Sequence, residues 1–191
     1  LAGMGAMAME QAIQMLEGNM PKEKHIVLQD AQFKSTNTEY GDKIGVEGFS
    51  FGGTMTALLV MNHPDAFHYG IAGGGVYDWA LYDTHYTERF MDTPANNPEG
   101  YASTKVVASA ANYPVTEKNY DGSVMLKLTH GTGDDNVHFQ NTLLLVDALQ
   151  KAGKKFELMI YPDGMHGYRG YQGKHFSEAN RAFWLKYLKG E

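Results

Sequence analysis

Gly48-Phe49-Ser50-Phe51-Gly52-Gly53 is the stretch that decides how the rest of this chain is interpreted. Residues 43–47 before it are typical of a short buried strand, and residues 54–61 after it are typical of a helix. The pattern Gly-x-Ser-x-Gly between a strand and a helix is characteristic of a nucleophile on a sharp turn, although the five residues alone also fit an incidental serine. We therefore predict that Ser50 is a nucleophile. The amide N–H of Phe51, at the helix N-terminus, is expected to face a developing oxyanion.

Length and composition exclude several other kinds of protein. The 191 residues suffice for one domain with a hydrophobic core. The formal net charge of -6 and the lack of a basic cluster argue against nucleic acid as a partner. Without cysteine, the chain has no disulfide, thiolate metal site or cysteine nucleophile. No apolar run approaches membrane-spanning length, so we expect no membrane contact from this segment.

Strand-like and helix-like segments alternate along the chain after residue 40. The predicted buried strands are residues 43–47, 68–73, 123–129 and 156–161. The predicted helices are residues 54–61, 101–111, 139–152 and 177–188, with a loop at 94–100. Nearer the N-terminus, a helix over residues 1–18 and a strand at 25–28 are indicated. This alternation predicts a mainly parallel α/β sheet with helices on both faces.

Polar loops after later strands supply the other groups that a serine nucleophile needs. The hydroxyl requires a base to take its proton, and the base requires an acidic partner. Ligands of open α/β sheets gather at the carboxyl ends of strands, where we expect the Asp134-Asp135 pair and His166. The chain order serine, aspartate, histidine agrees with this chemistry. Spacing alone does not separate Asp134 from Asp135.

The other histidines fit the role of base less well. His130 and His138 flank the aspartate pair, and each lies too close in sequence to Asp134 to be delivered to the site independently of it. His63 follows the helix after Ser50 and is expected to lie away from the reacting end. Only His166 lies in a glycine-flanked loop after a late strand.

Residues 76–91 are rich in aromatic side chains. Tyr82, Tyr86 and Phe90 recur at intervals of four, so one helical face could carry all three. On this spacing alone, core packing and a substrate pocket are equally good interpretations.

Four motifs together give a specific resemblance. They are Gly48 to Gly53, Tyr86-Thr87-Glu88-Arg89-Phe90-Met91, His130-Gly131-Thr132-Gly133-Asp134-Asp135-Asn136-Val137-His138-Phe139 and Asp163-Gly164-Met165-His166-Gly167. Over residues 41–190 the chain resembles the catalytic domain of the prolyl oligopeptidase family, and most of all its dipeptidyl peptidase IV branch. The resemblance implies the C-terminal part of an α/β-hydrolase fold, with residues 1–191 as an incomplete catalytic domain.

The same resemblance implies roles for individual residues. Ser50 would be the nucleophile, Asp134 the acidic partner and His166 the base. The side chains that would form a pocket for a proline ring are Phe51, Val76, Trp79, Tyr82, Tyr86 and Val137. Asn136 would hydrogen-bond the substrate carbonyl one residue nearer its N-terminus. A flat pyrrolidine with no N–H suits such an aromatic box.

The implied activity is a serine exopeptidase that releases X-Pro or X-Ala dipeptides from a peptide substrate, without cofactor or metal. Two alternatives are an acyl-peptide hydrolase or esterase of the same fold and a non-catalytic binding domain. The resemblance also implies a homodimer through the C-terminal region. A periplasmic, cell-envelope or extracellular location is implied in the same way.

Some features depart from the family pattern. Phe49 and Phe51 stand where relatives often have tryptophan and tyrosine, and residues 21–40 match no part of the pattern. The family's N-terminal propeller, second oxyanion donor and amine-binding glutamates are expected to lie outside this chain. For the same reason we expect an uncovered sheet edge beside the strand that precedes Ser50.

Overall fold

The computed structural model describes residues 25–28, 31–35 and 43–190, with side chains from residue 43 onward except that of Lys189. In these ranges the strands form one sheet in the order β1-β2-β3-β4-β5-β6. Their bounds are β1 His25–Leu28, β2 Ala31–Ser35, β3 Ile44–Phe49, β4 Tyr69–Gly73, β5 Leu126–Gly131 and β6 Glu157–Tyr161. The pairs from β3 to β6 are parallel, whereas β1, β2 and β3 pair antiparallel. The predicted helix over residues 1–18 lies outside the described residues.

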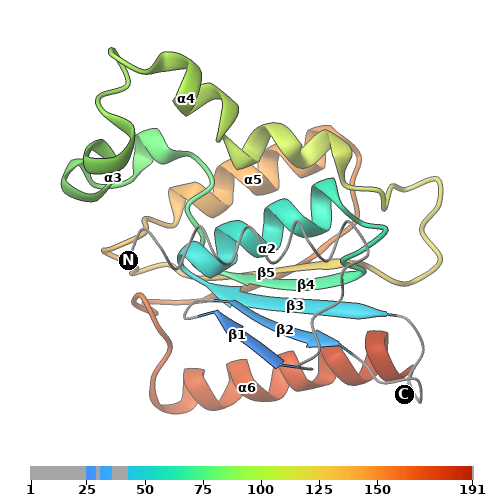
Figure 1. Cartoon of the computed structure of the whole chain (residues 1–191). Helices are drawn as coiled ribbons and strands as arrows, with labels where there is room; N and C mark the ends of the chain where they lie inside the picture. The colour runs from blue at the N-terminus through green and yellow to red at the C-terminus, as the bar shows by residue number, and fades with distance from the viewer. Residues whose placement is uncertain (1–24, 29–30, 36–42, 191) are drawn as a thin grey trace.

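Helices cover both faces of the sheet (Figure 1). The α-helices are α2 Phe51–Asn62, α3 Thr84–Met91, α4 Pro98–Ser103, α5 Gln140–Lys151 and α6 Gly170–Trp184. Short 3-10 and π turns are η1 Trp79–Leu81, η2 Val106–Asn112 and η3 Leu185–Lys189. Figure 1 shows α2 and α5 on one face and α6 on the other, with α3 and α4 projecting from the body. The predicted parallel α/β arrangement is therefore confirmed.

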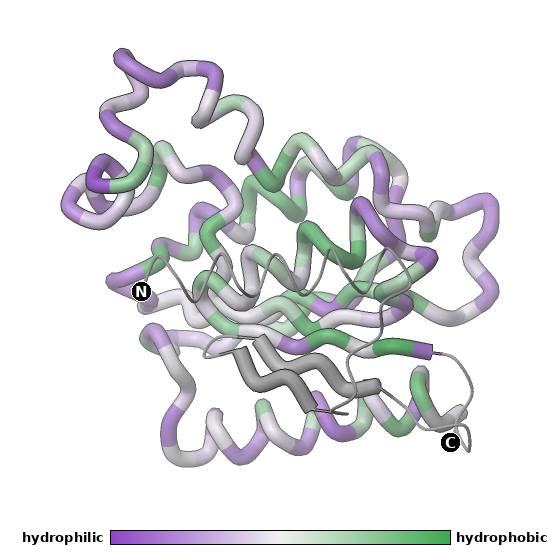
Figure 2. Tube along the Cα trace, viewed as in Figure 1, coloured by the Kyte–Doolittle hydropathy of each residue, from purple (hydrophilic) through white to green (hydrophobic). Residues whose placement is uncertain are grey.

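Hydrophobic side chains fill the space on each side of the sheet. The larger cluster lies between the sheet, α2 and α5 and includes Val46, Val60, Leu128 and Leu145, all 0% exposed. A smaller cluster under α6 consists of Ile71, Val124, Phe183 and Tyr187. Figure 2 shows hydrophobic residues concentrated along α2, α5 and the central strands, and mainly hydrophilic residues in the projecting segment. These two layers hold the strands whose ends carry the polar loops.

Helix α6 is tied to β3 by polar contacts as well as by packing. The carboxylate of Glu47 accepts hydrogen bonds from Asn180 Nδ2 and Trp184 Nε1, both at 2.8 Å. The indole ring of Trp184 lies where a Cβ on Gly45 would stand, so only glycine fits this position of β3. The position of α6 is thus set by the strand that leads into Ser50.

The expected open edge beside β3 is wrong. Strand β2 pairs antiparallel with β3 over its whole length, from Ala31 opposite Gly48 to Ser35 opposite Ile44. The predicted strand at 25–28 is confirmed as β1, and it pairs with β2 in turn. Residues 25–35 therefore supply strands that occupy the edge of β3.

Several predicted boundaries shift for local reasons. The stretch 101–111 contains the end of α4 and most of η2 instead of one helix. Helix α4 begins at Pro98, within the predicted loop, because Asn97 caps it by accepting the Gly100 N–H at 3.0 Å. Helix α6 begins at Gly170, seven residues before the predicted start, and no apolar periodicity marks its first turns. Strand β6 is less buried than predicted, since its Leu158 and Ile160 are 38% and 37% exposed. None of the helices in the described ranges is long and apolar enough to cross a bilayer.

Candidate active site

Ser50 occupies the turn between β3 and α2 in a strained conformation. Its φ of 59° and ψ of -122° lie in a region that residues with a side chain rarely adopt. The Ser50 N–H donates to the Gly73 carbonyl at 2.8 Å, which joins the turn to the end of β4. A Cβ on Gly48 would overlap the Gly52 carbonyl, and one on Gly53 would overlap the Gly73 carbonyl. The glycines therefore permit the close approach of strand and helix that the turn requires.

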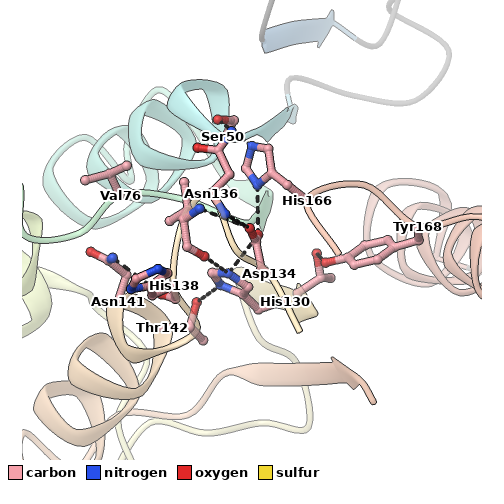
Figure 3. Close-up of polar contacts among 12 residues, drawn as sticks. Ser50, Val76, His130, Asp134, Asn136, His138, Asn141, Thr142, His166 and Tyr168 are labelled. Atoms are coloured by element: carbon pink, nitrogen blue, oxygen red, sulfur yellow. Dashed lines mark hydrogen bonds and ion pairs between the residues drawn. The ribbon is translucent and has the colours of Figure 1, made fainter. Parts of the chain in front are cut away.

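Three side chains from different loops form one hydrogen-bonded chain. His166 Nε2 lies 2.9 Å from Ser50 Oγ, and His166 Nδ1 lies 2.8 Å from Asp134 Oδ2 (Figure 3). A carboxylate can only accept, so Nδ1 carries the proton and Nε2 presents its lone pair to the hydroxyl. The His166 side chain is 18% exposed, so a substrate can reach it. This is the geometry in which a histidine can take a proton from serine.

Asp134 and Asp135, which spacing could not separate, occupy different environments. The Asp134 side chain is 1% exposed, and its Oδ1 accepts the backbone N–H groups of Asn136 and Val137, each at 3.0 Å. The Asp135 residue is exposed to solvent. Only Asp134 therefore touches His166, and its carboxylate is fixed by the backbone of its own loop.

The imidazole of His166 packs against the ring of Phe49, which in turn packs against Tyr168. The Phe49 ring lies 5.1 Å from the His166 ring and 5.7 Å from the Tyr168 ring, centroid to centroid. Tyr168 donates its hydroxyl to Thr129 Oγ1 at 3.3 Å, and burial raises the pKa of this phenol. Phe49 thus fills the space beside the base with a ring.

Aromatic residues gather beside Ser50 on α2, η1 and α3. The Phe51 ring lies 6.0 Å from Trp79, and Trp79 stacks on Tyr86 at 6.4 Å. Tyr82 meets Tyr86 edge-on at 5.5 Å. The prediction that Tyr82 shares a helix with Tyr86 is wrong, because α3 begins only at Thr84 after the capping residue Asp83. The rings nevertheless converge, and Tyr86 is 43% exposed, which argues against core packing of this side chain.

The remaining predicted pocket residues differ in their exposure to solvent. Val76 and Val137 are 2% and 0% exposed, so they offer at most a narrow surface to a ligand. Asn136 is exposed, and its Oδ1 accepts the Tyr82 hydroxyl at 2.8 Å. This bond leaves the amide nitrogen of Asn136 as its donor group, the group that a substrate carbonyl would need. Phe51 is the first residue of α2, so its N–H has no acceptor within the helix.

Buried polar residues that the sequence did not single out support the site. Thr54 Oγ1 accepts the Val76 N–H and donates to the Val76 carbonyl, both at 2.9 Å. Asn141 Oδ1 accepts the N–H groups of Tyr77 and Asp78 at 3.0 and 3.1 Å. Their only signal in the sequence is their position, four residues after Ser50 and early in the helix that follows Asp134. Within the described part of the chain, no group of three or more histidine and carboxylate side chains is arranged to hold a metal ion.

Comparison with known proteins gives consistent matches. The family model described as "Prolyl oligopeptidase family" matches residues 14–191. Dipeptidyl peptidase 8 of Mus musculus is 41% identical over 128 residues, which is 67% of this chain and 14% of that protein. A probable dipeptidyl-aminopeptidase B of Neurospora crassa is 41% identical over 142 residues, 73% of this chain and 14% of that protein.

A solved structure agrees with these matches. The crystal structure of Porphyromonas gingivalis dipeptidyl peptidase 4 superposes with a TM-score of 0.67 at 35% sequence identity. The match covers 74% of this chain and 19% of that one. The chain thus aligns with only 14% of the length of these curated relatives.

Proposed function

Since the chain belongs to the prolyl oligopeptidase family and has the α/β-hydrolase fold of its relatives, we propose that it carries the catalytic residues of a serine dipeptidyl peptidase. Residues 1–191 would form part of the catalytic domain. The observation that supports this most directly is the hydrogen-bonded chain from Ser50 through His166 to Asp134. A hydroxyl, an imidazole in the correct tautomer and a buried carboxylate are the groups that acyl transfer requires.

The reaction proceeds through an acyl-enzyme. Ser50 Oγ attacks the scissile carbonyl carbon while His166 Nε2 takes the hydroxyl proton, and the Phe51 N–H stabilises the negative charge on the carbonyl oxygen. His166 then gives the proton to the departing amine as the C–N bond breaks. Water attacks the ester by the same route and releases the acid. Asp134 stabilises the imidazolium in both halves without itself taking the proton.

Specificity rests on the aromatic rings beside Ser50. A proline or alanine side chain before the scissile bond would contact Trp79, Tyr82 and Tyr86, whose clustered rings give an apolar surface. Asn136 would donate its amide N–H to the carbonyl of the preceding residue. The products released would be X-Pro and X-Ala dipeptides, and the partner would be the peptide substrate.

The decisive experiment assays the full-length protein on an X-Pro-nitroanilide with its N-terminal amine free or acetylated. We expect turnover of the free amine and little of the acetylated substrate. Ser50→Ala should lower kcat by several orders of magnitude while leaving the circular dichroism spectrum unchanged. A fluorophosphonate should label the wild-type protein but not Ser50→Ala.

Each alternative has its own outcome. Equal turnover of both substrates would replace the dipeptidyl peptidase with an endopeptidase, and a preference for the acetylated one would indicate an acyl-peptide hydrolase. A folded protein that no fluorophosphonate labels would be a non-catalytic binding domain.

A further inference from the structure

His130 is a buried titratable residue that the catalytic steps above do not use. It belongs to β5, four residues before Asp134, and is 0% exposed. Its Nε2 lies 2.8 Å from the Val137 carbonyl oxygen and 3.2 Å from Asp134 Oδ2. Its Nδ1 lies 2.7 Å from Thr142 Oγ1 on α5. Figure 3 shows the contacts running from His166 through Asp134 to His130 and Thr142.

These partners fix the protonation of the ring. The Val137 carbonyl can only accept, so Nε2 carries a proton, and that N–H lies with its positive end beside the Asp134 carboxylate. Nδ1 is then free to accept the Thr142 hydroxyl. Burial lowers the pKa of His130, although the Val137 carbonyl and Asp134 oppose this change. Burial thus favours the neutral ring, and the Val137 carbonyl keeps its donor on the side of Asp134.

The ring closes the loop that carries Asp134. The Val137 N–H donates to Asp134 Oδ1 at 3.0 Å, while the Val137 carbonyl accepts from His130. Both ends of the loop are thus held around the carboxylate. The imidazole also packs edge-on against Phe139 at 5.6 Å, so it has little freedom to rotate. His130 reaches the Asp134 carboxylate because its ring projects back across the loop, whereas His166 is the histidine that contacts Ser50.

We propose that His130 is a positioning residue, which holds the Asp134 carboxylate in the orientation that His166 requires. This inference rests on the proposed function of Ser50, Asp134 and His166. Thr142 contributes by keeping the proton of His130 on Nε2. The neutral ring supplies the positive end of a dipole without adding a second imidazolium next to His166.

The test compares two substitutions in the full-length protein. Glutamine places an amide N–H near the position of Nε2, whereas asparagine keeps only a polar group near Nδ1. We expect His130→Asn to lower kcat about 10- to 100-fold, the range for one lost hydrogen bond to a charged group, with KM nearly unchanged. His130→Gln should restore kcat to within about tenfold of wild type.

A double-mutant cycle separates positioning from general stability. In an Asp134→Asn background, His130→Asn should change the rate of fluorophosphonate labelling by less than about threefold. An equal loss of labelling rate in the wild-type and Asp134→Asn backgrounds would overturn the proposal. An unchanged kcat in folded His130→Asn would do the same. If His130→Asn does not fold, Thr142→Val serves instead, because it removes only the hydroxyl that donates to Nδ1 and supports the tautomer set by the Val137 carbonyl. Unchanged kcat in folded Thr142→Val would then count against the proposal.

Labelling of the wild-type protein distinguishes a failure of the positioning role from a failure of the proposed function. If the reagent labels wild type, and His130→Asn and His130→Gln have the same kcat, only the positioning role fails. If wild type is not labelled at all, the proposed function fails first.

Discussion

Ser50 and Asp134 illustrate how single residues are held against their ordinary preferences. The backbone of Ser50 is in a region that costs about 1–3 kcal/mol for a residue with a side chain. The cost is sustained because the Ser50 N–H is bonded to Gly73 and the turn is flanked by packed elements. Asp134 is buried, yet each of its oxygens has a donor at 3.0 Å or less. Strain and buried charge therefore occur together at one place, as expected of a functional site.

The aspartate pair offers the sharpest comparison between neighbouring residues. Asp134→Asn should lower kcat by about 10⁴, because the amide favours the wrong tautomer of His166. Asp135→Asn is the matched control, since Asp135 is exposed and the same atoms are exchanged. Its kcat should stay within about twofold of wild type. Steady-state kinetics of both variants would decide, and a mild Asp134→Asn with a severe Asp135→Asn would contradict this assignment.

At the scale of elements, two helices align the aromatic cluster of Trp79, Tyr82 and Tyr86 with the proposed catalytic residues. Thr54 on α2 bonds both backbone groups of Val76, and Asn141 on α5 bonds the next two N–H groups. Helix α2 follows the Ser50 turn, and α5 follows the Asp134 loop. The segment 76–78 is therefore held by the same helices that carry these loops, which explains how Trp79 and Tyr82 come to lie beside Ser50.

Asn141→Leu should release this segment. The substitution leaves the buried N–H groups of Tyr77 and Asp78 without an acceptor, which should lower the free energy of unfolding by at least about 2 kcal/mol. KM for an X-Pro substrate should rise as the pocket loosens. Urea denaturation and steady-state kinetics would measure both effects.

Gln140→Ala is the control for this change. Gln140 precedes Asn141 in α5 and is exposed, so its loss should alter the free energy of unfolding by less than about 0.5 kcal/mol. Similar small effects in both variants would show that Asn141 does not hold the segment.

At the scale of the whole molecule, two buried phenols make the stability of the fold depend on pH. Tyr77 and Tyr113 are both 0% exposed, and burial is the main reason that their pKa values are raised. Tyr113 lies against the start of β5, where its hydroxyl oxygen accepts the N–H groups of Met125 and Leu126 at 2.9 and 3.1 Å. These phenols stay neutral in the folded protein at a pH where the unfolded chain ionises.

We expect a loss of stability in alkali. A tyrosine whose pKa is raised in the folded state contributes fully to the free energy of unfolding below about pH 10, which is its pKa in the unfolded chain. This contribution declines as the pH rises above that value. Ionisation of each of the two tyrosines in the unfolded chain should lower the free energy of unfolding by about 1.4 kcal/mol at about pH 11. Urea titrations between neutral pH and pH 11 would show this decline, and Tyr120→Phe, at an exposed position, should leave its slope unchanged. A flat stability profile would contradict the expectation.

The sequence by itself determined the strand, turn and helix around Ser50, the alternation that gives a parallel sheet, and the loops that carry Asp134 and His166. These features follow from local periodicity and turn chemistry, which depend on residues close together in the chain. Only the tertiary structure decided that Asp134 rather than Asp135 contacts His166 and that His130 contacts the same carboxylate. It also decided that β2 pairs with the edge of β3. The physical reason is that side-chain direction, burial and strand pairing depend on contacts between distant segments. The bond between Ser50 and His166 spans 116 residues, and no local pattern specifies such a distance.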